Sequence, residues 1–162
     1  MKPRSYQTRA LKELEAADWT GLLRLDVGFG KSAIAAWAAQ KAGAESVLVI
    51  APKRTQLGWE KTFNMLDIPL RAATKANKKE KANLDALFSG EPGYYWMTLE
   101  LARSMNVELR YDGRKRRNVR KSVRNPFNGR VFDMLIVDEV QKMSHHQSQA
   151  RAVVSRIAAK AR

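Results

Sequence analysis

Cysteine is absent from this sequence of 162 residues, and only two histidines occur. The lack of cysteine excludes disulfide bonds and thiolate metal sites, and it suits a reducing cytoplasm. His145 and His146 are adjacent but have no cysteines or spaced carboxylates near them, so they do not predict a metal site. No apolar run approaches the roughly 18 residues of a membrane span, and the N-terminus lacks the core of a signal peptide. We therefore expect a cytoplasmic protein without a membrane segment.

Acidic residues are also scarce. The sequence has 16 aspartates and glutamates against 30 lysines and arginines, which gives a net charge of +14. Such an excess indicates a polyanionic partner, most commonly nucleic acid, and the alternative is a merely soluble charged surface. The charge is concentrated in one stretch, residues 106–130, which we call the basic segment. Its part from 113 to 130 has no acidic residue and carries Arg114, Lys115, Arg116, Arg117, Arg120, Lys121, Arg124 and Arg130.

We predict that the basic segment neutralises phosphates of nucleic acid, DNA in the first instance, without reading the base sequence. Tyr111 and Phe127 are candidates for stacking on bases. The alternative interpretation is a flexible charged loop with no specific partner.

The chain length and a hydrophobic content of 44% predict one globular domain. Apolar periodicity predicts helices at 6–17, 31–42, 55–66, 75–88, 100–104 and 147–161. Strands are predicted at 21–25, 46–51, 69–73, 94–98 and 134–137, with two more near 107–111 and 129–132. Strands that alternate with helices indicate an α/β fold, with a mainly parallel sheet and helices on both of its faces. The four tryptophans are expected in the core or at an interface.

A glycine-rich turn ending in Gly30, Lys31 and Ser32 lies between the predicted strand 21–25 and the alanine-rich helix 31–42. Small residues let backbone N–H groups surround an anion, Lys reaches the outer phosphates, and the Ser hydroxyl can bind Mg²⁺. The strict phosphate-loop spacing would require glycine at Leu25, so the match is incomplete. The turn predicts binding of a nucleoside triphosphate, and the alternative is a simple glycine turn with a solvated Lys31.

Asp138 and Glu139 directly follow the apolar run 134–137, which we expect to be a parallel strand buried on both faces. Ligand sites in open α/β sheets gather at the carboxyl ends of strands, so the pair is expected beside the glycine turn. Asp138 is the candidate Mg²⁺ ligand together with Ser32, and Glu139 is the candidate base that activates water. A solvated turn or a helix cap is the alternative for such a pair.

These blocks together resemble the N-terminal RecA-like ATPase lobe of superfamily 2 helicases and translocases, with most similarity to Swi/Snf-type DNA translocases and related phage or restriction helicases. Gln7 matches the glutamine that reads adenine, and residues 26–32 match motif I, where this family often lacks the early glycine. The resemblance implies ATP and Mg²⁺ as cofactors, bound by Gln7, Gly28, Phe29, Gly30, Lys31 and Ser32. Lys31, Asp138, Glu139 and Gln141 would be the catalytic residues of motifs I and II.

The resemblance also implies nucleic-acid contacts at Pro52, Lys53 and Arg54 in motif Ia and at Thr98 in motif Ib. The sequence stops at Arg162, before motif III, and nothing in it matches the motifs of a second lobe with its arginine finger. We therefore expect residues 1–162 to form one lobe, with the second lobe on another chain or in a longer product, and with weak hydrolysis by this chain alone. The compact and split design favours a phage or mobile-element origin.

Two other interpretations stay open. The chain can be a non-enzymatic nucleic-acid-binding protein derived from such a lobe, or, less favoured, a nucleotide kinase. Intact Lys31, Ser32, Asp138 and Glu139 favour catalysis, because a pure binder needs no general base. The basic segment argues against the kinase.

Overall fold

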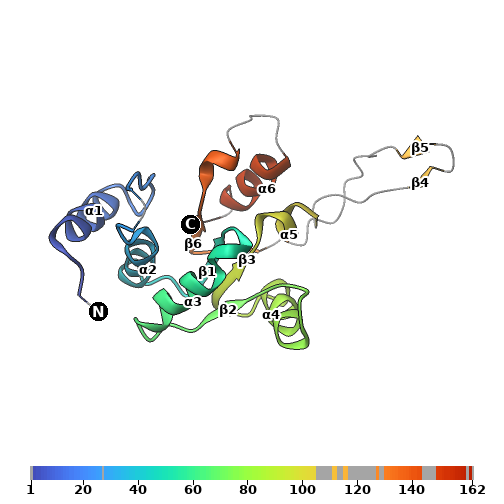
Figure 1. The fold of residues 1–162 in the computed structure, drawn as a ribbon, viewed down its shortest axis with the longest axis horizontal. Coiled ribbons are helices and arrows are strands. Elements are labelled where there is room, and N and C mark those ends of the chain that lie inside the picture. The colour runs from blue at the N-terminus through green and yellow to red at the C-terminus, as the bar shows by residue number, and fades with distance from the viewer. Residues whose placement is uncertain are drawn as a thin grey trace.

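The computed structural model describes residues 2–26, 28–104, 111–112, 115–116, 127, 130–143, 149–159 and 161. Its centre is a sheet of four parallel strands in the order β2-β3-β1-β6 (Figure 1). These strands are β1 (Ser46–Ile50), β2 (Leu70–Ala72), β3 (Gly93–Met97) and β6 (Met134–Val137). In the basic segment, β4 (Tyr111–Asp112) and β5 (Lys115–Arg116) pair antiparallel with each other.

Six α-helices occur in the described residues, each within a few residues of a predicted helix. They are α1 (Ser5–Ala16), α2 (Lys31–Lys41), α3 (Gln56–Asn64), α4 (Lys78–Ser89), α5 (Leu99–Ser104) and α6 (Gln149–Ala158). Two 3₁₀ turns, η1 (Lys53–Thr55) and η2 (Val140–Met143), follow β1 and β6. Among these elements, no helix has the length and apolar character that crossing a bilayer would require.

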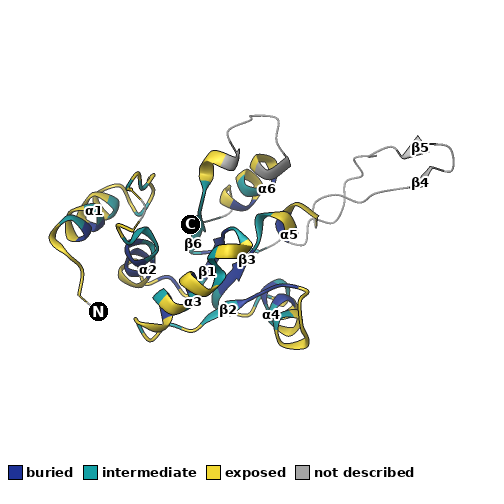
Figure 2. Ribbon diagram, in the orientation of Figure 1, coloured by how far each residue is buried: buried dark blue, intermediate teal, exposed yellow. Residues whose placement is uncertain are grey.

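Alternation along β1 builds a core on each face of the sheet, because successive side chains of a strand point in opposite directions. Val47 and Val49 face α2 and α3, where Trp59 and Phe63 are buried. Leu48 and Ile50 belong to the opposite cluster, which α4, α5 and α6 cover. Figure 2 shows the buried strands at the centre and the exposed outer sides of the helices. The predicted α/β fold with helices on both faces is confirmed.

The strand predicted at 21–25 is wrong. Residues 21–26 have no regular secondary structure and pair with no strand of the described sheet. Leu23 and Leu25 instead pack against a third cluster, formed mainly by Leu11 of α1 and Ile34 of α2, while Leu22 is exposed. These two leucines are therefore buried against helices. A strand would also need a neighbouring strand whose backbone forms hydrogen bonds with it.

Burial of β6 also differs from the prediction. All four of its residues are half-buried, because β6 lies at an edge of the described sheet with only β1 as a neighbour. Residues 130–132 are not a strand, and residues 107–110 and 129 lie outside the described part of the chain.

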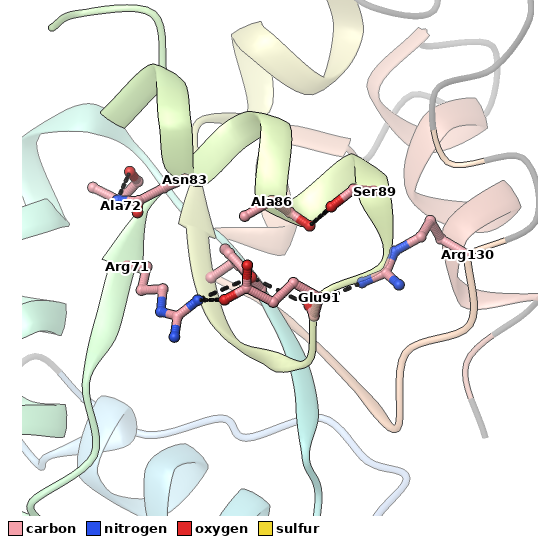
Figure 3. Close-up of polar contacts among 8 residues, drawn as sticks. Arg71, Ala72, Asn83, Ala86, Ser89, Glu91 and Arg130 are labelled. Atoms are coloured by element: carbon pink, nitrogen blue, oxygen red, sulfur yellow. Dashed lines mark hydrogen bonds and ion pairs between the residues drawn. The ribbon is translucent and has the colours of Figure 1, made fainter. Parts of the chain in front are cut away.

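The basic segment rejoins the fold through Phe127 and Arg130. Phe127 is only 3% exposed and its ring lies edge-on to that of Phe88, with centroids 5.5 Å apart. Phe127 is thus a core residue, and the prediction that it stacks on bases is wrong for this structure. Arg130 donates to the backbone oxygen of Glu91, and Arg71 of β2 pairs with the carboxylate of the same residue (Figure 3).

Candidate nucleotide site

The glycine turn caps α2 in a conformation that suits an anion-binding loop. Gly28 and Gly30 have positive φ angles of 87° and 69°, and Gly30 is the N-cap of α2. The Lys31 ammonium folds back across the loop and donates to the carbonyl oxygens of Leu25 and Asp26, at 2.8 and 2.9 Å. The loop thus gathers a helix N-terminus and a cation at one place, and both favour negative charge. Val27 lies outside the described residues.

Gln7 packs directly against this turn. Its side chain is buried, and its carboxamide nitrogen donates to the Phe29 backbone oxygen at 3.4 Å. Its carboxamide oxygen accepts from the Arg4 backbone N–H at 2.9 Å. A Cβ added to Gly30 would lie 2.7 Å from the Gln7 nitrogen, and the φ angle of 69° favours glycine at this position.

Tyr6 is a neighbour of the loop that the sequence reasoning missed. Its ring lies edge-on to Phe29 with centroids 5.6 Å apart, and its hydroxyl donates to the Phe29 backbone oxygen at 3.4 Å. Only its position beside Gln7 in the sequence could have indicated this. α1 therefore supplies two side chains that hold Phe29.

Asp138 is fixed where β6 ends. Its backbone N–H donates to the Ile50 oxygen of β1 at 2.9 Å. One carboxylate oxygen accepts from the Trp59 indole N–H at 3.2 Å, and the other accepts from the Glu139 backbone N–H at 2.9 Å. The sequence predicted Trp59 as a core or interface residue. It is buried, but it also orients the candidate metal ligand, a role that no pattern in the sequence indicated.

Glu139 follows in a left-handed conformation, with φ of 54°, and forms an ion pair with Arg54. Arg54 lies in η1 after β1, and Ile50 is in register with Val137, so both residues leave the same edge of the sheet. The Glu139 side chain is 16% exposed, against 73% for that of Arg54. A predicted nucleic-acid contact and the candidate base are therefore joined.

The other predicted nucleic-acid residues of this edge have local partners. The Lys53 ammonium donates to the Gln56 side chain at 2.9 Å, and the Pro52 backbone oxygen accepts from the Thr55 N–H at 2.9 Å. The Thr98 hydroxyl accepts from the Leu101 N–H at 3.0 Å and so stabilises the start of α5. All three lie just after β1 or β3, as the sequence placed them.

The two halves of the site lie on different elements, with Lys31 at the start of α2 and Asp138 directly after β6. Among the hydrogen bonds and ion pairs of the described residues, none joins Lys31 to Asp138. The halves share a core, in which α2 and α3 pack on the same face of β1.

Gln141 is exposed in η2.

The remaining predicted nucleic-acid residues belong to the basic segment. Lys115 and Arg116 are in β5, and nothing is described of their side chains. The other residues that lie outside the described part are Arg114, Arg117, Arg120, Lys121, Arg124, His145 and His146.

The residues present fit ATP and Mg²⁺. The Lys31 ammonium bonds carbonyl oxygens beside the N-terminus of α2, so a phosphate placed there would meet both a cation and a helix N-terminus. Asp138 offers a carboxylate at the end of β6, and Mg²⁺ is commonly held by one or two carboxylates completed by water and phosphate oxygens. In the part of the chain that is described, no group of three or more His, Cys, Asp or Glu side chains that could hold a metal ion occurs.

Comparison with known protein families gives one finding that covers nearly the whole chain. Residues 1–161 match the family described as "Type III restriction enzyme, res subunit". No curated protein matches the sequence. The family match includes both halves of the site, from Gln7 to Glu139, and all the described strands and helices.

Proposed function

The chain belongs to the type III restriction enzyme res-subunit family, a helicase-like superfamily 2 ATPase domain, and we propose that it hydrolyses ATP as one lobe of a nucleic-acid-dependent helicase or translocase. The observation that carries this proposal is the loop before α2, where two left-handed glycines, a helix N-terminus and the Lys31 ammonium meet. This arrangement favours a polyphosphate over a neutral ligand.

Each side chain has a role in this proposal. Lys31 exchanges its two carbonyl partners for phosphate oxygens, Gln7 and Phe29 contact the base, and Asp138 with Ser32 holds Mg²⁺. Bound Mg²⁺ neutralises charge on the phosphates. Glu139 orients a water molecule and accepts its proton, and Gln141 senses the state of the site from η2.

DNA is the proposed partner, with its phosphates bound by Lys53, Arg54, Thr98 and the basic segment and its backbone in contact with Pro52. Within superfamily 2, we propose that the chain is most similar to Swi/Snf-type and phage enzymes and that it acts in the cytoplasm. A second RecA-like lobe would supply the arginine finger, whose contribution of about 10³–10⁵ in rate explains why we expect slow hydrolysis by this chain alone.

A non-enzymatic nucleic-acid-binding protein is the second candidate. One observation favours it: Lys31 and Glu139 each have partners within the protein, and Lys31 is not bonded to Asp138 in the described structure. In that case the acidic pair would serve folding or switching, without proton transfer.

ATP hydrolysis by the full chain, with and without duplex DNA, tests the proposal, and Glu139→Gln is the matched control. Turnover that DNA stimulates and that Glu139→Gln abolishes would support the ATPase. Salt-sensitive DNA binding with no turnover, both alone and with added second lobes, would favour the binding protein.

A further inference from the structure

Two side chains of α1 donate to the same backbone oxygen of the glycine turn. The Tyr6 hydroxyl and the Gln7 carboxamide nitrogen each lie 3.4 Å from the carbonyl oxygen of Phe29. Tyr6 is 23 residues from Phe29 in the sequence and Gln7 is 22, so only the packing of α1 brings these donors to the turn. The Phe29 carbonyl therefore points toward α1.

The direction of the Gly30 N–H follows from that of the carbonyl. The peptide bond between Phe29 and Gly30 is planar and trans, so its C=O and its N–H point in opposite directions. The Gly30 N–H is thus turned away from α1. Gly30 is the N-cap of α2, and the N–H groups of an N-cap and of the next three residues have no acceptor within their own helix. Among the hydrogen bonds of the described residues, none has the Gly30 N–H as its donor, so it is left for an anion at the start of α2.

The backbone alone does not choose this orientation. A flip of the peptide unit changes ψ of Phe29 and φ of Gly30, and glycine adopts positive and negative φ about equally readily. Gly30 has φ of 69° in this structure. In the flipped unit the Phe29 carbonyl oxygen would face the anion and repel it. The two donors of α1 favour the orientation that presents the N–H.

We propose that Tyr6 is a positioning residue for the phosphates of the nucleotide, and that it acts together with Gln7 by holding the Phe29–Gly30 peptide with its N–H toward them. This inference rests on the proposed function and adds a residue of α1 to the phosphate-binding half of the site. The Gln7 carboxamide has two N–H groups, so its bond to Phe29 is compatible with its proposed contact to the base.

The ring of Tyr6 allows the hydroxyl to be tested by itself. It lies edge-on to the Phe29 ring, with centroids 5.6 Å apart and an interplanar angle of 64°. Tyr6→Phe keeps this contact and removes only the donor to the Phe29 carbonyl. A change in ligand affinity in this variant therefore reports on the hydroxyl.

Inorganic tripolyphosphate distinguishes a role in phosphate binding from a contact with the base, because it has phosphates like those of ATP but no base or ribose. Calorimetric titrations of the full chain with tripolyphosphate and with ATP, each with Mg²⁺, measure the two Kd values. We expect Tyr6→Phe to weaken both ligands by the same factor, about two- to fivefold, which is the lower part of the range for a neutral hydrogen bond because 3.4 Å is long. Weaker binding of ATP alone, or unchanged binding of both ligands, would overturn the inference.

A second variant tests whether the two donors share one task. Gln7→Met keeps the length of the side chain and removes its donor. Either donor can hold the carbonyl when the other is absent, so the double variant Tyr6→Phe/Gln7→Met should lose at least the product of the two single losses in tripolyphosphate affinity. A smaller loss in the double variant would contradict a shared hold on the Phe29 carbonyl.

The matched control is Tyr94→Phe. The Tyr94 phenol also donates to a backbone carbonyl, that of Ala44 just before β1, at 2.6 Å. Its removal should lower the Tm without a change in the Kd of tripolyphosphate. Equal weakening of tripolyphosphate binding in Tyr6→Phe and Tyr94→Phe would show that the loss follows from general destabilisation, and the inference would be rejected.

The two proposals fail separately. If wild type binds both ligands and Tyr6→Phe binds them equally well, the proposed function stands and the role of Tyr6 is rejected. If wild type binds both ligands but hydrolyses no ATP with nucleic acid and added second lobes, the ATPase proposal fails, and the two Kd values of Tyr6→Phe still decide its role. If wild type binds neither ligand, both proposals are rejected.

Discussion

The indole N–H of Trp59 donates to a carboxylate oxygen of Asp138 across 3.2 Å, from a helix on one face of the sheet to the end of an edge strand. Trp59 is 4% exposed, so its orientation is fixed by the surrounding core. Asp138 therefore keeps one oxygen bonded to an immobile donor, and its other oxygen accepts from the Glu139 backbone. This contact links the packing of α3 to the proposed metal site.

Trp59→Phe should loosen Asp138 while it preserves most of the buried ring. We expect the Mg²⁺ concentration for half-maximal turnover to rise about three- to tenfold, because a hydrogen bond to a charged group contributes about 1.5–3 kcal/mol and only part of it acts on metal binding. Trp96→Phe is the matched control, since the Trp96 indole N–H is buried and has no partner among the described residues. A Mg²⁺ dependence shifted equally by both variants would contradict this role of Trp59.

Gly30→Ala should remove nucleotide binding and destabilise the fold. The added Cβ would meet the Gln7 carboxamide nitrogen at 2.7 Å, and the backbone at φ 69° is strained for any L side chain. Thermal melts with and without ATP and Mg²⁺ measure both effects, and we expect the ATP-induced rise in Tm to disappear.

Gly58→Ala is the opposite case and serves as its control. Gly58 lies in α3, and a Cβ there would have nothing within 4 Å. Alanine should stabilise the protein by roughly 0.5–1 kcal/mol, because glycine loses more backbone entropy in a helix. Denaturant unfolding checks this, and a loss of stability would show that the exposed side of α3 is not free.

Tyr94 should make stability fall in alkaline solution. Burial, and then the nearby Asp133 charge, raise the pKa of the Tyr94 phenol above its ordinary value of 10.0. The folded state therefore retains the proton longer than the unfolded state does, so this contribution is complete below pH 10 and is lost as pH rises through the folded pKa.

Unfolding of wild type and Tyr94→Phe from pH 8 to pH 11 measures this contribution. We expect the variant to be less stable at pH 8 by about 1 kcal/mol, because the phenol donates to the Ala44 oxygen at 2.6 Å. The free energy of unfolding of the variant should also fall less than that of wild type as the pH rises. If the two proteins lose stability in parallel with pH, the pKa of Tyr94 does not differ between the folded and unfolded states.

The basic segment should set the salt dependence of nucleic-acid binding. Replacement of Arg116, Arg117 and Arg120 by Gln should reduce the slope of log K against log salt by about 0.9 for each phosphate that the variant no longer neutralises. Lys78, Lys79 and Lys81 of α4, also replaced by Gln, give the control with the same net charge change. If the two triple variants change the slope equally, only the total charge of the chain matters.

The sequence by itself determined the helices and the four parallel strands. Apolar spacing of 3.6 and 2 residues reports which side chains of one element are buried, and this depends only on neighbours along the chain. The glycine turn before α2, and the position of Asp138 and Glu139 directly after a strand, could be read for the same reason.

Only the tertiary structure decided which strands are neighbours and what surrounds the site. The Trp59–Asp138 bond joins residues 79 apart, and the Arg54–Glu139 pair joins residues 85 apart. Residues 21–25 have a strand-like pattern but pack on helices, and Phe127 is buried against Phe88 although its neighbours in sequence are basic. Local pattern reports that a side chain is apolar or charged, whereas its partner depends on the order of strands and the packing of helices, which the whole chain fixes together.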